Sequence, residues 1–380
     1  MEERRFSLSV LFVWLILLSY CSNSGREIEL DEIPYESENT LLSNLIGERY
    51  HLDVESYLIE AALLNGIFSS VYPPEPIDAA SSNNGDLILF LRSEETLVKV
   101  DPEDNINIIA SPGRGPNSIE SGIKLIQSVK HPILLQRNRV SSISCASDCS
   151  LNVMHSIDEY FNYYNFTLDG KIIVNGYNPF GGNTIQVKDQ DLQSIKSFGE
   201  FFRHSNPSYV RHFNFSSIEL SADQRYLVHL FSDFPTVAIY ELETFTYKSF
   251  SIHEFYHHAM SSFSSNSSEV EIDYQKRHSQ MFNINQYGSD KFLITVKHRR
   301  ELERARGFTA SPETYFYDYY ILSIDDGFSY AGSSTDVIVP IDSRVIFHHD
   351  FLLYKLDIPF SEMAELQKKS NSEFNLPELF

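Results

Sequence analysis

The stretch TLDGKIIVNGYNPFGGNTIQVKDQDLQSIKSFG, residues Thr167 to Gly199, decides the fold of this chain. Three short apolar segments lie within it, at Lys171 to Asn175, Ile185 to Val187 and Ile195 to Phe198. An Asp-Gly pair precedes the first segment, and a Gly/Pro-rich loop separates the first from the second. Such sequences are typical of turns between antiparallel strands. The stretch therefore predicts a small antiparallel meander.

The same pattern recurs along most of the chain, and six copies are visible. Their paired apolar segments are 86–91 with 97–100, 133–136 with 140–144, 171–175 with 185–187, 226–228 with 237–240, 291–296 with 319–324, and 344–347 with 351–356. The copies start roughly 40 to 65 residues apart, which is the spacing of propeller blades. A four-stranded blade cannot bury both of its faces alone, so blades stack around an axis. We predict an all-β fold, a six-bladed β-propeller of four-stranded antiparallel blades.

The last copy has room for only part of a sheet before the chain ends. We therefore expect N- and C-terminal strands to close the ring together, with the N-terminal strand within Gly47 to Leu58. The apolar segments Leu41 to Ile46 and Tyr57 to Leu64 fit helix and strand equally well, and their type stays open.

The N-terminus predicts export. Residues 6 to 20 are mostly apolar, Arg4 and Arg5 precede them, and Cys21 follows directly. About 15 apolar residues are fewer than the ~20 that a spanning helix needs, so we interpret residues 1–20 as a signal peptide. The sequence Leu17 to Cys21 resembles a bacterial lipobox, in which the cysteine is lipidated. An uncleaved signal anchor, or an ordinary signal with Cys21 as a bystander, is the alternative.

Residues 21–40 are then expected to form a flexible acidic tether, and residues 41–380 a single β-propeller domain. The predicted location is the cell envelope, with the outer membrane favoured and the membrane as a partner through the lipid. The chain has 52 acidic and 30 basic residues, for a net charge of −22. Nucleic acid is therefore excluded as a partner, because phosphate-binding surfaces need clustered Lys and Arg.

A distinctive loop follows the first copy and contains Gly113, Arg114, Gly115 and Pro116. This Gly-Arg-Gly-Pro sequence, together with the lipobox and the later Ser197-Phe198-Gly199, resembles the TolB-like six-bladed propeller lipoproteins of Gram-negative bacteria. The resemblance implies the fold and the location, and it implies no particular activity. We expect the two glycines to supply positive φ at a blade corner, with anion binding by the loop as the alternative.

Cys145 and Cys149 are the only cysteines besides Cys21. In an oxidising compartment, a disulfide across a short turn is the expected state. A metal site formed by the two cysteines would need two further ligands, and a redox-active pair usually has two residues between its cysteines. The remaining alternative is two free thiols.

Three further segments are chemically suggestive. His253 to His257 matches H-E-x-x-H, the zinc-protease pattern, but it follows an alternating strand, so an inter-blade loop is favoured. Lys297 to Arg306 is strongly basic and predicts a short solvated helix, with partner docking as the alternative. Tyr315 to Tyr320 predicts an aromatic strand whose rings mostly pack in the core.

Two classes of function remain. The first is a binding or scaffold protein for a glycan, peptide or protein partner, and the second is a propeller-type hydrolase, such as a calcium-assisted lactonase or a glycan-cleaving enzyme. The second needs converging carboxylates near the axis. Asn175 and His229, on strands of the repeats, are not a matching set of acids. The sequence therefore favours binding, and it assigns no catalytic residue, metal ligand or cofactor.

Overall fold

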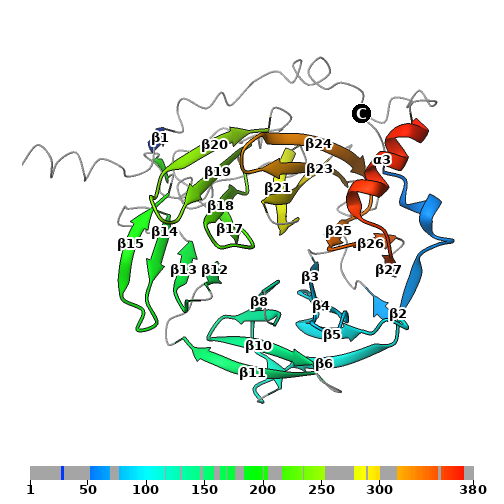
Figure 1. Cartoon of the computed structure of the whole chain (residues 1–380), viewed down its shortest axis with the longest axis horizontal. Coiled ribbons are helices and arrows are strands. Elements are labelled where there is room, and N and C mark those ends of the chain that lie inside the picture. Colours follow the sequence, from blue (N-terminus) through cyan, green and yellow to red (C-terminus); the bar gives the residue numbers. More distant parts are fainter. Residues whose placement is uncertain are drawn as a thin grey trace, which may run out of the picture.

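The computed structural model describes residues 27–29, 52–68, 77–115, 117–128, 131–145, 149–157, 163–167, 169–175, 184–199, 201–203, 216–233, 235–252, 278–287, 290–299, 315–349 and 352–371. These residues form six antiparallel sheets arranged in a ring (Figure 1). The predicted six-bladed β-propeller is confirmed.

In blades 1 to 5 the strands follow one another in chain order from the axis outward. Blade 1 contains β3 (Ile77–Ser81), β4 (Leu87–Leu91), β5 (Thr96–Val100) and β6 (Ile106–Pro112), with the short β7 (Ser118–Ile119) added parallel to β6. Blade 2 contains β8 (Gly122–Ile126), β9 (Ile133–Gln136), β10 (Arg139–Cys145) and β11 (Cys149–Ser156). Blade 3 contains β12 (Tyr163–Phe166), β13 (Ile172–Asn175), β14 (Ile185–Lys188) and β15 (Ser194–Phe198).

Blades 4 and 5 repeat this order, and blade 6 differs because an N-terminal strand is its outermost member. Blade 4 contains β17 (Ser216–Leu220), β18 (Tyr226–Phe231), β19 (Thr236–Glu241) and β20 (Tyr247–Ser251). Blade 5 contains β21 (His278–Gln286), β22 (Lys291–Arg299), β23 (Tyr315–Ser323) and β24 (Gly327–Ser334). Blade 6 contains β25 (Ile338–Ile341), β26 (Arg344–His349), β27 (Leu352–Leu356) and the N-terminal strand β2 (Ala62–Phe68). The paired apolar segments of the six sequence copies fall on the second and third strands of the six blades.

Apolar side chains fill the spaces between neighbouring blades. Val228 and Ile239 of blade 4 share one buried cluster with Ile294 of blade 5. Val140 of blade 2 similarly packs with Tyr164 of blade 3. Each fully buried side chain of this size contributes about 1.5–3 kcal/mol. Because each cluster needs two blades, the ring is stable only as an assembly of all of them.

The closing strand is not where the sequence placed it. Within the expected range Gly47 to Leu58, residues Val54–Tyr57 form a 3-10 helix, η3, which Asp53 caps. The closing strand is instead β2, where Ala62 pairs with Lys355 and Phe68 with Leu352 of β27. The expectation that an N-terminal strand completes the last blade is right, and its assigned range is wrong.

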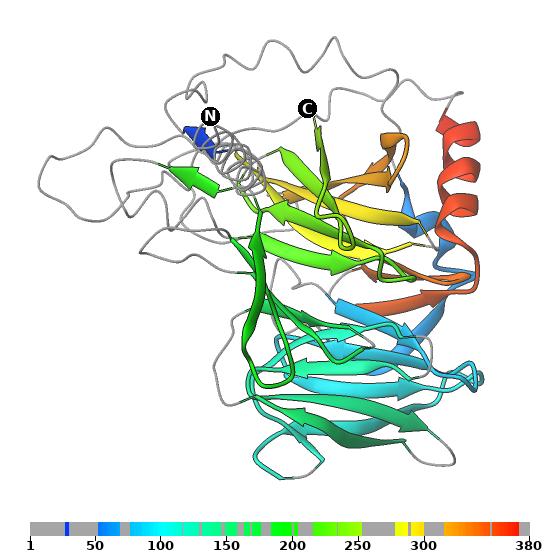
Figure 2. The same ribbon diagram turned by 60° about the vertical axis from the view of Figure 1, so that its left-hand side comes forward.

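A C-terminal helix, α3 (Phe360–Asn371), lies along the side of the ring next to the N-terminal segment (Figure 2). Phe360 and Met363 are fully buried, and the Tyr57 hydroxyl lies 3.5 Å from the Met363 carbonyl oxygen. The sequence analysis did not predict this helix. Pro359 fixes its start, and apolar residues at positions one, four and five of the helix give it a buried face.

Of the expected tether, the structure describes only β1 (Glu27–Glu29), which pairs in parallel with β16 (Phe201–Arg203). None of the helices in the described ranges is both long enough and apolar enough to cross a lipid bilayer.

Candidate functional site

The turns between the first and second strands lie on one face of the ring, which we call the turn face. Three of these turns share one design, in which the first residue carries a hydroxyl that accepts a hydrogen bond from a backbone N–H at the end of the turn. The accepting hydroxyls and donating amides are Ser82 and Asp86 at 3.2 Å, Thr167 and Lys171 at 2.9 Å, and Ser221 and Tyr226 at 3.0 Å.

The fourth residue of each turn adopts a left-handed conformation. It is Gly85 with φ 82° in blade 1, Gly170 with φ 84° in blade 3 and Gln224 with φ 58° in blade 4. The backbone N–H of each donates to the carbonyl of the first turn residue, at 3.0, 3.0 and 2.9 Å. Glycine adopts this conformation freely, whereas a residue with a Cβ does so at a cost of roughly 1–2 kcal/mol. The turn of blade 4 is therefore strained where its two counterparts are relaxed.

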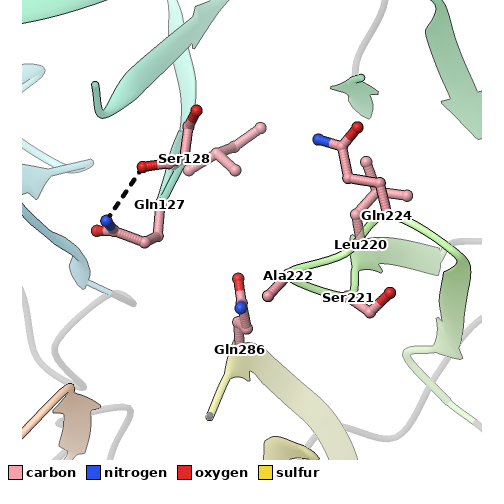
Figure 3. Close-up of a pocket in the computed structure, with 8 residues that line it drawn as sticks. Gln127, Ser128, Leu220, Ser221, Ala222, Gln224 and Gln286 are labelled. Carbon is pink, nitrogen blue, oxygen red and sulfur yellow. Dashed lines mark hydrogen bonds between the residues drawn. The ribbon is translucent and has the colours of Figure 1, made fainter. Parts of the chain in front are cut away.

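Gln224 lines a pocket that opens at the turn face (Figure 3). The pocket is partly open to solvent, and its cavity volume is about 120 Å³, which is smaller than the roughly 300–1,000 Å³ that is usual for a small-molecule site. Its walls come from the inner strands, or the turns that follow them, of blades 2, 4 and 5: Ile126, Gln127, Ser128, Leu220, Ser221, Ala222, Gln224 and Gln286. We call it the axial pocket. Its lining carries amide and hydroxyl groups and apolar carbons, and no charged side chain.

The Gln127 side chain is fixed by the neighbouring blade. Its Oε1 accepts from the backbone N–H of Ser81 at 2.7 Å, and its Nε2 donates to the carbonyls of Ser81 and Ser128, each at 3.3 Å. The Ser81 hydroxyl in turn donates to the carboxylate of Asp342, which follows β25. These bonds tie blades 6, 1 and 2 together beside the pocket, so the wall formed by Gln127 is rigid.

An ion pair joins blades 2 and 4 close in the chain to pocket-lining residues. Lys124 of β8 contacts the carboxylate of Glu219 of β17. Glu219 directly precedes the pocket-lining Leu220, and Lys124 lies two residues before the pocket-lining Ile126. Burial lowers the pKa of the Lys124 amine to about 8, while the nearby Asp78 carboxylate opposes that shift. A buried pair of this kind leaves a costly unpaired charge if one partner is removed. The pair therefore fixes blade 2 relative to blade 4.

Asp78 of β3 anchors the same region to blade 1. Arg92 holds it from two sides, with Nη2 2.7 Å from Oδ1 and Nε 3.1 Å from Oδ2. The backbone N–H of Leu125 also donates to Oδ2 at 2.9 Å. The inner strands of blades 1, 2 and 4 are thus joined by buried charges next to the axial pocket.

A serine, a histidine and an aspartate lie in a row inside blade 5. The Ser279 hydroxyl is 2.7 Å from Nδ1 of His298, and Nε2 of His298 is 3.1 Å from Oδ2 of Asp318. Asp318 also accepts from the hydroxyl of Ser333. These residue types can form a nucleophilic triad, but Ser279, His298 and Asp318 are each 0% exposed. The row therefore links the four strands of the blade and presents no hydroxyl to a substrate.

The cysteines of blade 2 form a disulfide, with Cys145 and Cys149 joined at the loop end of the β10–β11 hairpin. The Asp86 carboxylate lies within 4.8 Å of their sulfur atoms. In the described part of the chain, this is the one group of three or more His, Cys, Asp or Glu ligand atoms that are close enough to share a metal ion. Cys145 and Cys149 are bonded to each other, so this group offers a metal ion one ligand, the carboxylate of Asp86.

The Gly-Arg-Gly-Pro loop connects blade 1 to blade 2. Gly113 has φ 159°, and a Cβ added there would lie 3.2 Å from the Cβ of Ser118. Gly115 has no positive φ, so the expectation of positive φ is wrong for this glycine. Arg114 is 91% exposed and lies 3.9 Å from Glu120, while Pro116 is outside the described residues. Gly113, Arg114 and Gly115 are not among the residues that line the axial pocket.

Other sequence-predicted residues have mixed outcomes. Cys21 and the segment His253 to His257 lie outside the described residues. Lys297 to Arg299 belong to strand β22, so the helix predicted to begin at Lys297 is wrong for these residues, and the remainder of that segment is not described. The aromatic strand is confirmed as β23, in which Tyr317 and Tyr319 are fully buried.

Sequence reasoning missed the axial pocket. Its lining residues come from three blades and are ordinary glutamines, serines and aliphatic residues, which carry no motif. One signal was nevertheless present, because the turn sequences SNNG, TLDG and SADQ differ at their fourth position. Aligning the turns would have singled out Gln224.

Comparison with known proteins supports the fold. No protein-family model and no curated protein matches the chain. Among solved structures, a member of the DUF4221 family from Bacteroides vulgatus superposes with a TM-score of 0.50 at 13% identity, over 78% of this chain and 95% of the other.

Two further structures are more distant. A Bacteroides fragilis protein thought to be exported has a TM-score of 0.45 at 10% identity, over 76% of this chain and 83% of the other. A virginiamycin B lyase from Staphylococcus aureus has a TM-score of 0.37 at 11% identity, over 76% and 96%. Sequence identities this low bear on the fold alone.

Proposed function

We propose that this protein is an exported, lipid-anchored β-propeller that binds an uncharged polar ligand, a glycan or peptide segment, in the axial pocket. The observation that carries the proposal is the lining of that pocket. Three glutamines and two serines from three blades surround apolar carbons in this pocket. Carboxamides and hydroxyls both donate and accept hydrogen bonds, so they match sugar hydroxyls and peptide groups.

Charge supports a neutral ligand. The chain carries a net charge of −22, which disfavours anions in general. Lys124, which lies two residues before the pocket-lining Ile126, is already paired with Glu219. A ligand without charge avoids both the repulsion and the cost of breaking that buried pair.

The export and anchoring part of the proposal rests on the N-terminal sequence, with Cys21 as the lipidated residue and the resemblance to TolB-like lipoproteins as support. A tether at the N-terminus would hold the ring at a membrane surface and leave its binding face open to the surroundings. A binding role needs no more than this.

The test is to fill the pocket. Ala222 lines it, and Asn83 occupies the same turn position in blade 1, outside the pocket. The full chain, purified in detergent, is applied to arrays of neutral oligosaccharides and of acetylated, amidated peptides. We expect wild type and Asn83→Trp to retain the same ligands and Ala222→Trp to lose them, with all three melting at similar temperatures. Equal retention by Ala222→Trp, or no retention by wild type, would overturn the proposal.

A further inference from the structure

A carboxylate of blade 1 lies next to the disulfide of blade 2. Asp86 directly precedes β4, whereas Cys145 and Cys149 lie at the loop end of the β10–β11 hairpin. One carboxylate oxygen of Asp86 and the two sulfur atoms all lie within 4.8 Å of one another. The folded ring thus brings one oxygen and two sulfur atoms together from two blades.

The Asp86 carboxylate is buried without a counter-charge. Asp86 is 7% exposed, and its Oδ2 accepts a hydrogen bond from the Ser82 hydroxyl at 3.3 Å. No ion pair joins Asp86 to a Lys, Arg or His in the described ranges of the chain. Buried charges in proteins are normally paired or bound to a metal ion. A cation held jointly with the sulfur atoms would supply the missing positive charge.

The two cysteines are held in place by more than the bond between them. Cys145 and Cys149 are register partners, and the antiparallel pairing continues from them along the β10–β11 hairpin. The Asn84 side chain donates from Nδ2 to the carbonyl of Cys145 at 2.9 Å, which ties the hairpin to the turn that carries Asp86. Breaking the disulfide therefore leaves two thiols side by side next to the carboxylate.

We propose that reduction of the Cys145–Cys149 disulfide creates a zinc site formed by the two thiolates and the carboxylate of Asp86. A dithiol reductant supplies two electrons and two protons, which convert the disulfide into two thiols, and the reductant itself becomes a disulfide. Zn²⁺ then displaces the two thiol protons, because the thiolate is the form that binds metal.

The ligand set fits zinc. Two sulfur ligands favour Zn²⁺ over Ca²⁺ and Mg²⁺, which take oxygen ligands. The sulfur atoms move apart to roughly 3.8 Å, the ligand separation in a tetrahedral site with Zn–S bonds of about 2.3 Å. Water takes the fourth position, as it does in zinc sites with three protein ligands. Asp86, Cys145 and Cys149 do not line the axial pocket, so the zinc site adds to the proposed function and does not depend on it.

The redox test uses the full chain with Cys21→Ser, purified in detergent, in which Cys145 and Cys149 are the only cysteines. One sample stays oxidised, and the other is reduced with a dithiol that is then removed in the absence of oxygen. Both are titrated with Zn²⁺ in competition with a chromophoric chelator, and with Co²⁺ for its absorption spectrum. We expect the reduced protein to bind one more Zn²⁺ per chain than the oxidised protein, and it alone to show thiolate-to-cobalt charge-transfer absorption. Equal numbers of bound Zn²⁺ in the two states, or no such absorption after reduction, would overturn the inference.

The residue test replaces the carboxylate in the same Cys21→Ser background. We expect Asp86→Asn to lower the zinc affinity of the reduced protein by at least about tenfold, since losing even a group that only orients a metal ligand has an effect of that size. Asp86→Glu, which keeps a carboxylate, should bind zinc more tightly than Asp86→Asn. The matched control is Asp223→Asn, because Asp223 accepts from the Ser221 hydroxyl at 2.7 Å in the corresponding turn of blade 4 and belongs to no cluster with the sulfur atoms.

Asp223→Asn is expected to keep the zinc affinity of its parent. Circular dichroism of each reduced protein before metal is added checks that the ring is folded. Unchanged zinc affinity in folded Asp86→Asn, or an equal loss in Asp223→Asn, would overturn the role of Asp86 as a ligand.

Discussion

At the scale of single residues, burial without a hydrogen-bond partner determines how the protein responds to acid. Both ring nitrogens of His229 lack a hydrogen-bond partner, and the side chain is 0% exposed. Burial lowers the pKa of His229 to about 3. Between pH 6.5 and about 3 the unfolded chain binds a proton that the folded chain does not. The contribution of neutral His229 to the free energy of unfolding is therefore fully present above pH 6.5. Below that pH the free energy of unfolding falls by about 1.4 kcal/mol per pH unit.

His229→Phe should remove this dependence, because phenylalanine fills a similar space and does not titrate. When the pH is lowered from 7 to 5, we expect the difference in unfolding free energy, variant minus wild type, to increase by about 2 kcal/mol. Urea denaturation at the two pH values measures the difference, and pH 7, where the imidazole is neutral in both states, is the reference. Parallel pH profiles for the two proteins would contradict the assignment of this sensitivity to His229.

At the scale of elements, the β10–β11 hairpin combines a strand pair with a covalent link. The Cys145–Cys149 disulfide closes a short loop, for which the entropy of the unfolded chain predicts a stabilisation of about 2 kcal/mol. We expect the denatured, unreduced Cys21→Ser protein to show no reactive thiol. The double variant Cys145→Ser/Cys149→Ser should unfold at a free energy lower by up to that amount. Two labelled thiols per chain would refute the prediction.

The secondary-structure elements also show which parts of the fold could be predicted from the sequence. In each blade, the second and third strands either alternate apolar and polar residues or are continuously apolar, and clear turn sequences flank them. The sequence therefore located all six strand pairs. Strand β2 was misplaced because Ala62 to Leu64 is apolar without alternation and Gly66 interrupts the strand. Its pairing partner is also at the other end of the chain, which no local pattern reveals. The axial pocket was missed for the same reason, since Gln224 and Gln286 meet only in the folded ring.

At the scale of the whole molecule, ring closure should make unfolding cooperative. Deleting residues 344–356 removes β26 and β27 and leaves β25 and β2 without partners. We expect that deletion to abolish the single thermal transition, as measured by calorimetry. Truncation after residue 371, which retains every described element, is the control and should keep one transition. A deletion variant that melts like wild type would contradict the closed ring as the unit of stability.

The anchor is tested on the whole protein in cells. Cys21→Ser keeps the hydrophobic signal and removes the attachment thiol, so we expect labelled fatty acid and membrane recovery in wild type only. Each buried methylene of an acyl chain is worth about 0.8 kcal/mol, so losing the lipid removes the attachment altogether. A mutant retained as an uncleaved anchor would be recognised by its larger mass. Wild type without incorporated fatty acid would refute lipidation.

The pairing of β2 with β27 also sets the order of assembly during synthesis. Ala62 is made long before its partner Lys355, because the two paired strands are separated by the other five blades. Throughout elongation and any passage across a membrane, β2 therefore has no native neighbour to pair with, and the ring stays open. An unfinished chain keeps an unpaired strand that proteases and chaperones can detect. The last blade therefore closes only in a chain whose synthesis has passed β27, and a shorter chain keeps β2 unpaired.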